Sequence, residues 1–227
     1  MLFDSSIHDK VWHGLAQDYF DKILTSLELE QFHGRSCQTN LEYLAGKTMG
    51  GTELDHWVNI RESLYRNKCG RLIKAGKLSL SPGATDLFEF LKTQEIDFTI
   101  ATSSERGNVD FYRQYLFLDR WFNPAQIVYY DGTYPGKPAP DVYLKAASII
   151  NGTPAECIVI EDSLAGITAA KNAKIGYIIG LGPEGKYAAL LNAGAHRTIC
   201  DLREFPRELV NKNPSVILKL RRKKNLS

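Results

Sequence analysis

Three short polar segments of this 227-residue sequence stand where apolar runs end. Hydroxyl groups and an ammonium group suit the oxygens of a phosphate, whereas two adjacent carboxylates suit a hard divalent cation such as Mg²⁺. An anion and a cation bound side by side are the arrangement used in phosphoryl transfer. The candidate residues are Thr102, Ser103 and Ser104, then Lys137, then Glu161, Asp162 and Ser163.

Each segment alone has a simpler interpretation. Residues 102–104 and 161–163 could simply cap the helices that follow them. Lys137, which precedes Pro138, could be a solvated loop residue. All three signals at strand ends, in this order, favour a common site.

The surrounding elements decide whether these segments can meet. Residues 5–80 read as helices alone, with apolar residues at helical spacing, and predict a small helical bundle. From Ser81 onward short apolar runs alternate with helical patterns, in the strands "IDFTIATSS", "QIVYY", "ECIVIED", "IGYIIGLG" and "RTIC". This alternation predicts an α/β fold, a Rossmann-like doubly wound parallel sheet over residues 81–227. In such sheets ligands bind at the carboxyl ends of the strands.

Composition excludes several classes of protein. The formal net charge of +2, with 44% apolar and 24% charged residues, is ordinary for a globular protein and gives no global attraction to nucleic acid or to a membrane surface. No apolar run reaches the roughly 18 residues of a membrane-spanning helix. The N-terminus lacks the basic and apolar regions of a signal peptide. The basic tail "LKLRRKKNLS" is interpreted as a solvated chain end.

Cysteine and histidine spacing argues against disulfides and zinc. Cys37, Cys69, Cys157 and Cys200 lie far apart, which indicates a reducing, cytoplasmic location. The five histidines show no metal-ligand spacing. The segment "GTYPGKP" has neither the spacing nor the hydroxyl of a phosphate-binding P-loop.

Longer motifs make the chain similar to the haloacid dehalogenase-like hydrolases. "TIATSS", "GKPAPDVYLKAA" and "CIVIEDSLAGITAAKNA" resemble three motifs of the branch that contains β-phosphoglucomutase and small phosphatases with a helical cap, and "SPGATDLFEFLK" resembles its return from cap to core. The resemblance implies that Thr102 and Lys137 bind the transferring phosphoryl group and that Glu161 and Asp162 hold Mg²⁺. It further implies that Ser103 and Ser104 line the substrate side.

The family's Asp-x-Asp-Gly segment is missing from the sequence. In relatives it ends the first core strand, and its first Asp is the nucleophile while the second is the general acid and base. By resemblance, Asp4-Ser5 followed by His8 and Trp12 is the entry into the cap, so that residues 1–4 are the end of the linker and the nucleophile would lie ahead of Met1. In a rival alignment Asp4 itself is the nucleophile and Ser6 replaces the acid and base, but Met1–Phe3 are short for a strand of the usual five or six residues. A start-site error, a truncation and natural degeneration remain open.

Two classes of function follow from these residues. The first is a Mg²⁺-dependent phosphatase acting on a small phosphorylated metabolite through an aspartyl phosphate, with a sugar-phosphate mutase as a variant; the chain as printed would be inactive. The second is a non-catalytic protein that binds a phosphorylated ligand or a partner in the same pocket. Where relatives carry an Arg after the Gly of the cap specificity loop, this chain offers Lys47 and Thr48 as substrate-binding residues, which weakens the mutase interpretation. The substrate and the oligomeric state are not specified by the sequence.

Overall fold

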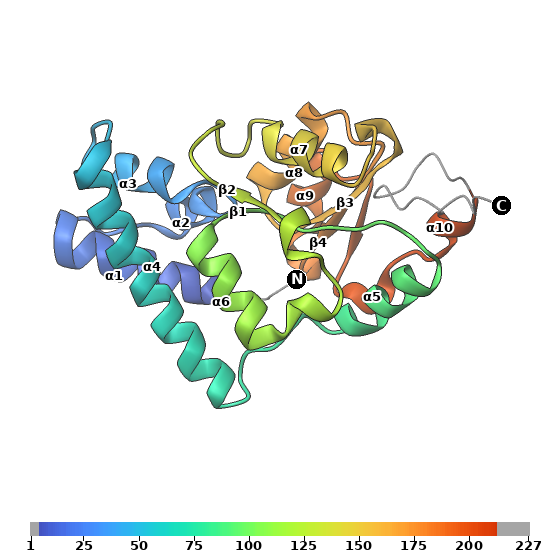
Figure 1. Cartoon of the computed structure of the whole chain (residues 1–227). Coiled ribbons are helices and arrows are strands. Elements are labelled where there is room, and N and C mark those ends of the chain that lie inside the picture. The colour runs from blue at the N-terminus through green and yellow to red at the C-terminus, as the bar shows by residue number, and fades with distance from the viewer. Residues whose placement is uncertain (1–4, 213–227) are drawn as a thin grey trace.

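The computed structural model describes residues 5–212 as helices packed beside two small parallel sheets. The predictions for residues 1–4 and for the basic tail fall outside this range. At one end lie four helices, α1 (Ser5–Phe20), α2 (Ser26–Phe32), α3 (Cys37–Ala45) and α4 (Gly51–Lys74), and at the other the α/β part of the chain (Figure 1). The strands are β1 (Ala101–Glu105), β2 (Val128–Tyr130), β3 (Ile158–Glu161), β4 (Tyr177–Leu181) and β5 (Arg197–Ile199).

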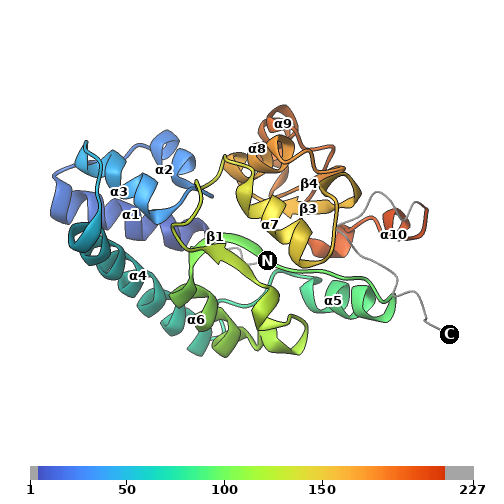
Figure 2. The same cartoon turned by 45° about the horizontal axis from the view of Figure 1, so that its top comes forward.

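Helices cover both faces of the strands. On one face lie α5 (Ala84–Thr93) and α6 (Arg106–Leu116), and on the other lie α7 (Asp141–Ile149), α8 (Leu164–Asn172) and α9 (Tyr187–Ala193) (Figure 2). The last described helix is α10 (Glu208–Lys212), and short 3₁₀ helices span Leu118–Arg120, Pro124–Gln126, Pro154–Glu156, Glu184–Lys186 and Leu202–Glu204. The α/β fold with parallel strands expected from the sequence is confirmed.

Alternation along the strands produces the two apolar layers. Ile158 packs with the α5 and α6 side, whereas its neighbour Val159 packs with α7 and α8, because successive side chains of a strand point to opposite faces. The same holds for Ile178 and Ile179 of β4.

The strands divide into a pair and a triplet. β1 pairs with β2 in parallel, and β3, β4 and β5 pair in parallel in that order, but within residues 5–212 no strand pairing joins β1 to β3. Both apolar layers nevertheless contain residues from each sheet, so the two sheets lie in one layer of the fold. The expected first core strand therefore has no counterpart between them in the described part of the chain.

One predicted strand is shorter than its apolar pattern. "IDFTIATSS" predicts a strand that begins near Ile96, whereas β1 begins at Ala101 and has an irregular register with β2. The backbone of Ile100 accepts a hydrogen bond from Val128, but β1 is paired on one side alone within residues 5–212. A strand with a neighbour on one side loses half of the ladder that keeps it regular.

Helix α4 connects the helical end to the α/β part. Tyr65 of α4 is fully buried, and its hydroxyl lies 2.7 Å from that of Tyr112 on α6. Arg66 donates to Asn108 Oδ1 over 3.1 Å at the same contact. Within residues 5–212 no helix is both long and apolar enough to cross a bilayer.

Candidate active site

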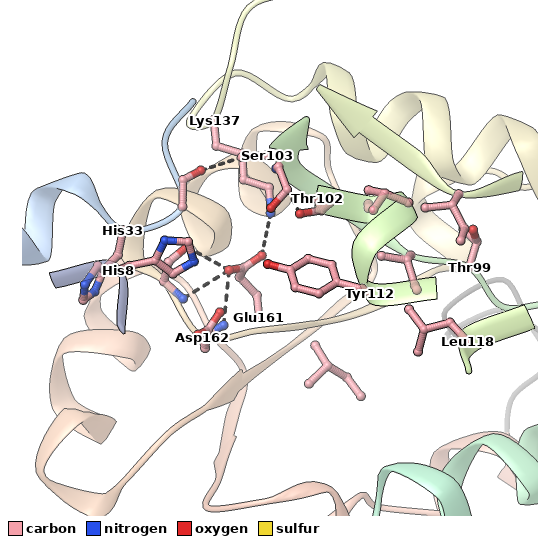
Figure 3. Close-up of a pocket in the computed structure, with 18 of the residues that line it drawn as sticks. His8, His33, Thr99, Thr102, Ser103, Tyr112, Leu118, Lys137, Glu161 and Asp162 are labelled. Carbon is pink, nitrogen blue, oxygen red and sulfur yellow. Dashed lines mark hydrogen bonds and ion pairs between the residues drawn. The ribbon is translucent and has the colours of Figure 1, made fainter. Parts of the chain in front are cut away.

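A cavity of about 330 Å³ lies among the helical end, β1 and β3. Figure 3 shows its two ends: Thr102, Ser103, Lys137, Glu161 and Asp162 gather at one, while Thr99 and Leu118 lie toward the other. The second end is apolar and continues between the two sheets, where its walls come from α5, residues 98–101, Leu116, Phe122, Ile127 and Ile160.

Lys137 and Glu161 form the centre of the polar end. Lys137 Nζ donates to Glu161 Oε2 over 2.7 Å and to the Tyr143 hydroxyl over 3.0 Å, and Tyr143 in turn donates to Glu161 Oε2 over 2.5 Å. Lys137 is 5% exposed and Glu161 is 9% exposed. The sequence places these groups at one edge of the sheet, but their direct contact, and the part of Tyr143, are visible only in the structure.

Local sequence holds Glu161 in place. Ser163 caps α8, since its Oγ accepts from the Gly166 amide over 3.0 Å and donates to Glu161 Oε1 over 2.8 Å. A Cβ at Gly166 would come within 2.0 Å of the Glu161 carboxyl carbon, so only glycine leaves room for this carboxylate.

The neighbours of Glu161 decide its charge. Burial alone would raise the pKa of Glu161, but the positive charge of Lys137 and the hydrogen bonds from Lys137, Tyr143 and Ser163 outweigh it and lower the pKa to about 2. Burial, followed by the negative charge of Glu161, raises the pKa of the Tyr143 hydroxyl well above its ordinary value. The site thus contains a carboxylate, an ammonium and a neutral phenol.

The three hydroxyl residues of β1 line the same cavity. Thr102 Oγ1 accepts from the Ser104 amide over 3.1 Å, and Ser103 Oγ donates to the Gly34 carbonyl over 2.6 Å. Gly34 belongs to the loop between α2 and α3, and its φ of +77° together with the closeness of Ser163 requires a residue without a Cβ. This loop therefore covers the polar end of the cavity.

The described residues provide part of a Mg²⁺ site. Glu161 and Asp162 are oxygen donors of the right chemistry, and Asp162 is exposed at the cavity. Both carboxylate oxygens of Glu161 are, however, engaged by Lys137, Tyr143 and Ser163, and residues 5–212 contain no group of three acidic, His or Cys side chains placed to hold a metal ion. Residues 5–212 alone do not fit a complete Mg²⁺ shell.

Two predicted residues lie away from the cavity. Lys47 is exposed and forms an ion pair of 2.9 Å with Glu53, and Thr48 is exposed beside it. The structure does not bring either side chain into the cavity lining. Their loop precedes α4, whereas the loop that covers the site precedes α3.

Instead, an arginine of α4 lines the part of the cavity that is formed by the helices of residues 5–74. Arg61 is 4% exposed, and its guanidinium lies 4.6 Å from the ring of Trp12 and 5.2 Å from that of Tyr65. It donates to Glu62 Oε1 over 2.7 Å and contacts His8 Nδ1. Sequence patterns alone did not identify Arg61, because a charged residue in a largely polar helix reads as exposed; the buried Trp12 is the signal that could have suggested an aromatic partner for a cation.

Glu105, at the end of β1, predicts a pH effect on stability because burial and charged side chains of α4 change its pKa. Burial and the charge of Glu62 raise the pKa of Glu105 to about 7, against the opposing charges of Arg61 and Arg66. A carboxyl whose pKa is raised by folding binds its proton more tightly in the folded state, so stability should fall as the pH rises from about 4.5 to about 7 and then level off. Glu105→Gln should remove this slope, which thermal unfolding at pH 5 and pH 8 would measure.

The matched control for this effect is Glu184→Gln, which changes an exposed carboxyl. It should leave the wild-type slope intact. If Glu105→Gln and the wild type lose the same amount of thermal stability between pH 5 and pH 8, the assignment of the slope to Glu105 is wrong.

Comparison with known proteins identifies the family of this site. The model of one family, haloacid dehalogenase-like hydrolase, matches residues 2–174. The chain belongs to the haloacid dehalogenase-like hydrolases. The resemblance inferred from the three motifs is thereby confirmed.

Relatives of this haloacid dehalogenase-like chain share both sequence and fold. It is 32% identical over 144 residues to the phosphorylated carbohydrates phosphatase of Thermotoga maritima, an alignment that covers 62% of this chain. It is 30% identical over 185 residues to the β-phosphoglucomutase of Bacillus subtilis, covering 77% of this chain and 76% of that enzyme. A haloacid dehalogenase hydrolase of Entamoeba histolytica matches with a TM-score of 0.79 and 33% identity over 92% of both chains.

The extent of these matches differs between relatives. The chain spans 64% of the length of the Thermotoga phosphatase, just under two thirds, and 25% and 48% of two further curated relatives.

Proposed function

We propose that this chain is a Mg²⁺-dependent phosphohydrolase for a small phosphorylated metabolite, active when a strand bearing an Asp pair lies between β1 and β3. The observation that carries the proposal is the convergence of Thr102, Lys137, Glu161 and Asp162 on one cavity. The phosphatase and mutase relatives support the same chemistry. In this function the helices of residues 5–80 act as a cap over an α/β core of residues 81–227, in the cytoplasm.

Each residue at the polar end has a separate part in this function. Lys137 offsets the negative charge of the phosphoryl group, and Thr102 donates a hydrogen bond to one of its oxygens. Tyr143 keeps the Glu161 carboxylate oriented, and Ser103 and Ser104 face the rest of the substrate. Glu161 and Asp162 would hold Mg²⁺, directly or through water, and the ion would supply positive charge beside the phosphate. The nucleophile and the general acid would come from the Asp pair of the strand between β1 and β3.

A second function is favoured by a different observation. Lys137 and Glu161 already satisfy each other, so residues 5–212 form a stable polar site without a further carboxylate. A non-catalytic protein that binds a phosphorylated ligand at this site would not need the Asp pair. A mutase receives support from the relative in Bacillus subtilis, but Lys47 and Thr48 lie away from the cavity.

An activity assay separates these functions. An extended chain should carry five apolar residues and Asp-x-Asp-Gly ahead of Met1. It should hydrolyse a chromogenic phosphate ester when Mg²⁺ is present, because the nucleophile then reaches the anion site. The chain as printed should show no turnover, although inorganic phosphate should bind to it.

The matched control replaces the first Asp of the added segment by Asn, which should abolish turnover and leave the fold intact. An extended chain that is folded, binds inorganic phosphate and shows no turnover with any of a panel of phosphate esters would favour the binding protein. Turnover by the printed chain at the rate of the extended chain would show that the nucleophile lies elsewhere.

A further inference from the structure

The apolar end of the cavity has no part in the binding of a phosphate. Phe98, Ile100 and Ile160 line it, and each of these large apolar side chains is only half-buried within residues 5–212. Removing such surface from water is favourable. A ligand with an apolar part would therefore gain affinity at this end of the cavity.

The polarity of the lining changes in the same direction along both strands. Residues 98–101 are mostly apolar and lead into the hydroxyls of residues 102–104, and Ile160 leads into Glu161. Figure 3 shows the result: Thr102 lies near Lys137, while Leu118 lies toward the opposite end. A ligand that matches this lining has a polar head and an apolar tail.

The polar end retains hydrogen-bond donors for an anionic head. A lysine ammonium has three hydrogens, and Lys137 gives two of them to Glu161 and Tyr143. Thr102 Oγ1 accepts from the Ser104 amide, so its own hydrogen remains to be donated. Donors of this kind suit the oxygens of a phosphate.

The charges around the cavity leave room for a phosphate. The lining contains three cationic and three acidic side chains, namely Arg35, Arg61 and Lys137, and Glu62, Glu161 and Asp162. An anionic head is therefore not opposed by a net negative lining.

We propose that the printed chain binds a phosphate monoester of a single alkyl chain. The phosphate lies against Lys137 and Thr102, and the alkyl chain lies between the two sheets along Phe98, Ile100 and Ile160. The cavity volume of about 330 Å³ is near the lower end of the range for small-molecule sites, about 300–1,000 Å³, which favours one alkyl chain over two.

This inference rests on the anion site of the proposed function and adds the chemical class of the ligand's other end. A strand between β1 and β3 would occupy the same space as the alkyl chain. The binding of an alkyl phosphate therefore belongs to the chain without that strand, and it deepens the non-catalytic function.

Calorimetry on the printed chain tests the inference without any need for turnover. The probes are inorganic phosphate, butyl phosphate and octyl phosphate, at concentrations at which neither ester forms micelles. Each methylene group removed from water raises affinity roughly threefold to fourfold. Octyl phosphate should therefore bind at least about thirtyfold more tightly than butyl phosphate, and at least about tenfold more tightly than octan-1-ol, which lacks the head group.

Two variants and a control locate the alkyl chain. Ile160→Asn and Ile100→Asn each place a polar group in the apolar end, and each should lower the ratio between the two esters at least about fivefold. Leu144→Asn makes a similar change on α7, at a side chain that is 43% exposed and outside the cavity lining, and should preserve the ratio. The comparison of the two esters on the unaltered chain needs no variant, so it stands even where a variant does not fold.

The outcomes separate this inference from the proposed function. If inorganic phosphate fails to bind to the printed chain, the anion site is wrong and both proposals fall. If phosphate binds but butyl and octyl phosphate bind equally, the alkyl site alone is wrong. The same conclusion follows if octan-1-ol binds as tightly as octyl phosphate, or if Leu144→Asn lowers the ratio as much as Ile160→Asn.

Discussion

Lys137→Met is expected to lower the free energy of unfolding by about 3–5 kcal/mol at pH 8, the usual cost of removing one partner of a buried ion pair. Glu161 is 9% exposed and would keep its negative charge in a site that no longer contains the ammonium. Methionine fills nearly the same volume, so the loss would be electrostatic rather than a packing effect. Chemical denaturation measures it directly.

The pH dependence of this loss follows from the pKa of Glu161. In the wild type that pKa is lowered to about 2, so the stabilisation is present above the ordinary carboxyl value near 4.5 and is lost as the pH falls toward 2. Without Lys137, burial raises the pKa of Glu161 instead, and protonation relieves the unpaired charge in acid. The difference between variant and wild type should therefore be smaller at pH 4.5 than at pH 8.

Two controls make the result specific. Lys145→Met removes a lysine whose side chain is 44% exposed and whose ion pair with Asp131 spans 3.9 Å, and it should cost no more than about 1 kcal/mol. The double variant Lys137→Met, Glu161→Gln should recover most of the lost stability, because no buried charge remains. A Lys137→Met chain as stable as Lys145→Met at pH 8 would mean that the pair contributes nothing.

The elements of the fold were largely predictable, and side-chain contacts at the site were not. Short apolar runs such as "ECIVIED" identified strands such as β3, because burial within a sheet leaves a local pattern in the sequence. The rule that ligands gather at carboxyl ends of parallel strands then placed residues 102–104, Lys137 and residues 161–163 around one cavity.

Contacts between elements left no such pattern. Tyr143 lies in a helix that reads as ordinary, and its hydroxyl reaches Glu161 only because of how α7 packs against β1, β2 and α8. Asn40 and Arg61 lie on helices with many polar residues, and their burial depends on how α3 and α4 pack against α1. Lys47 and Thr48 were expected at the site from a family pattern, but the loop that reaches the cavity is the one around Gly34.

A strand supplied ahead of Met1 is expected to join the two sheets. β1 and β3 both line the cavity and are not paired with each other within residues 5–212, and the walls around them are apolar, including Phe98, Ile100 and Ile160. An apolar strand there would bury its side chains in both layers and pair with backbone groups of both neighbours. In the extended chain described above, the backbone amide hydrogens of β3 should exchange with solvent at least about a hundredfold more slowly than in the chain without the added strand. This factor corresponds to about 2.7 kcal/mol of local stabilisation.

The control for this effect replaces the five apolar residues of the added strand by Ser and Gly and keeps Asp-x-Asp-Gly. It should leave the exchange of residues 158–161 as fast as in the printed chain, because a polar segment gains nothing from the apolar walls. The Asp→Asn variant of the apolar strand should keep the slow exchange although it lacks turnover, so that strand pairing and chemistry are measured separately. Equal exchange rates in the extended and printed chains would show that the cavity between β1 and β3 does not take a strand, and the source of the nucleophile would have to be sought elsewhere.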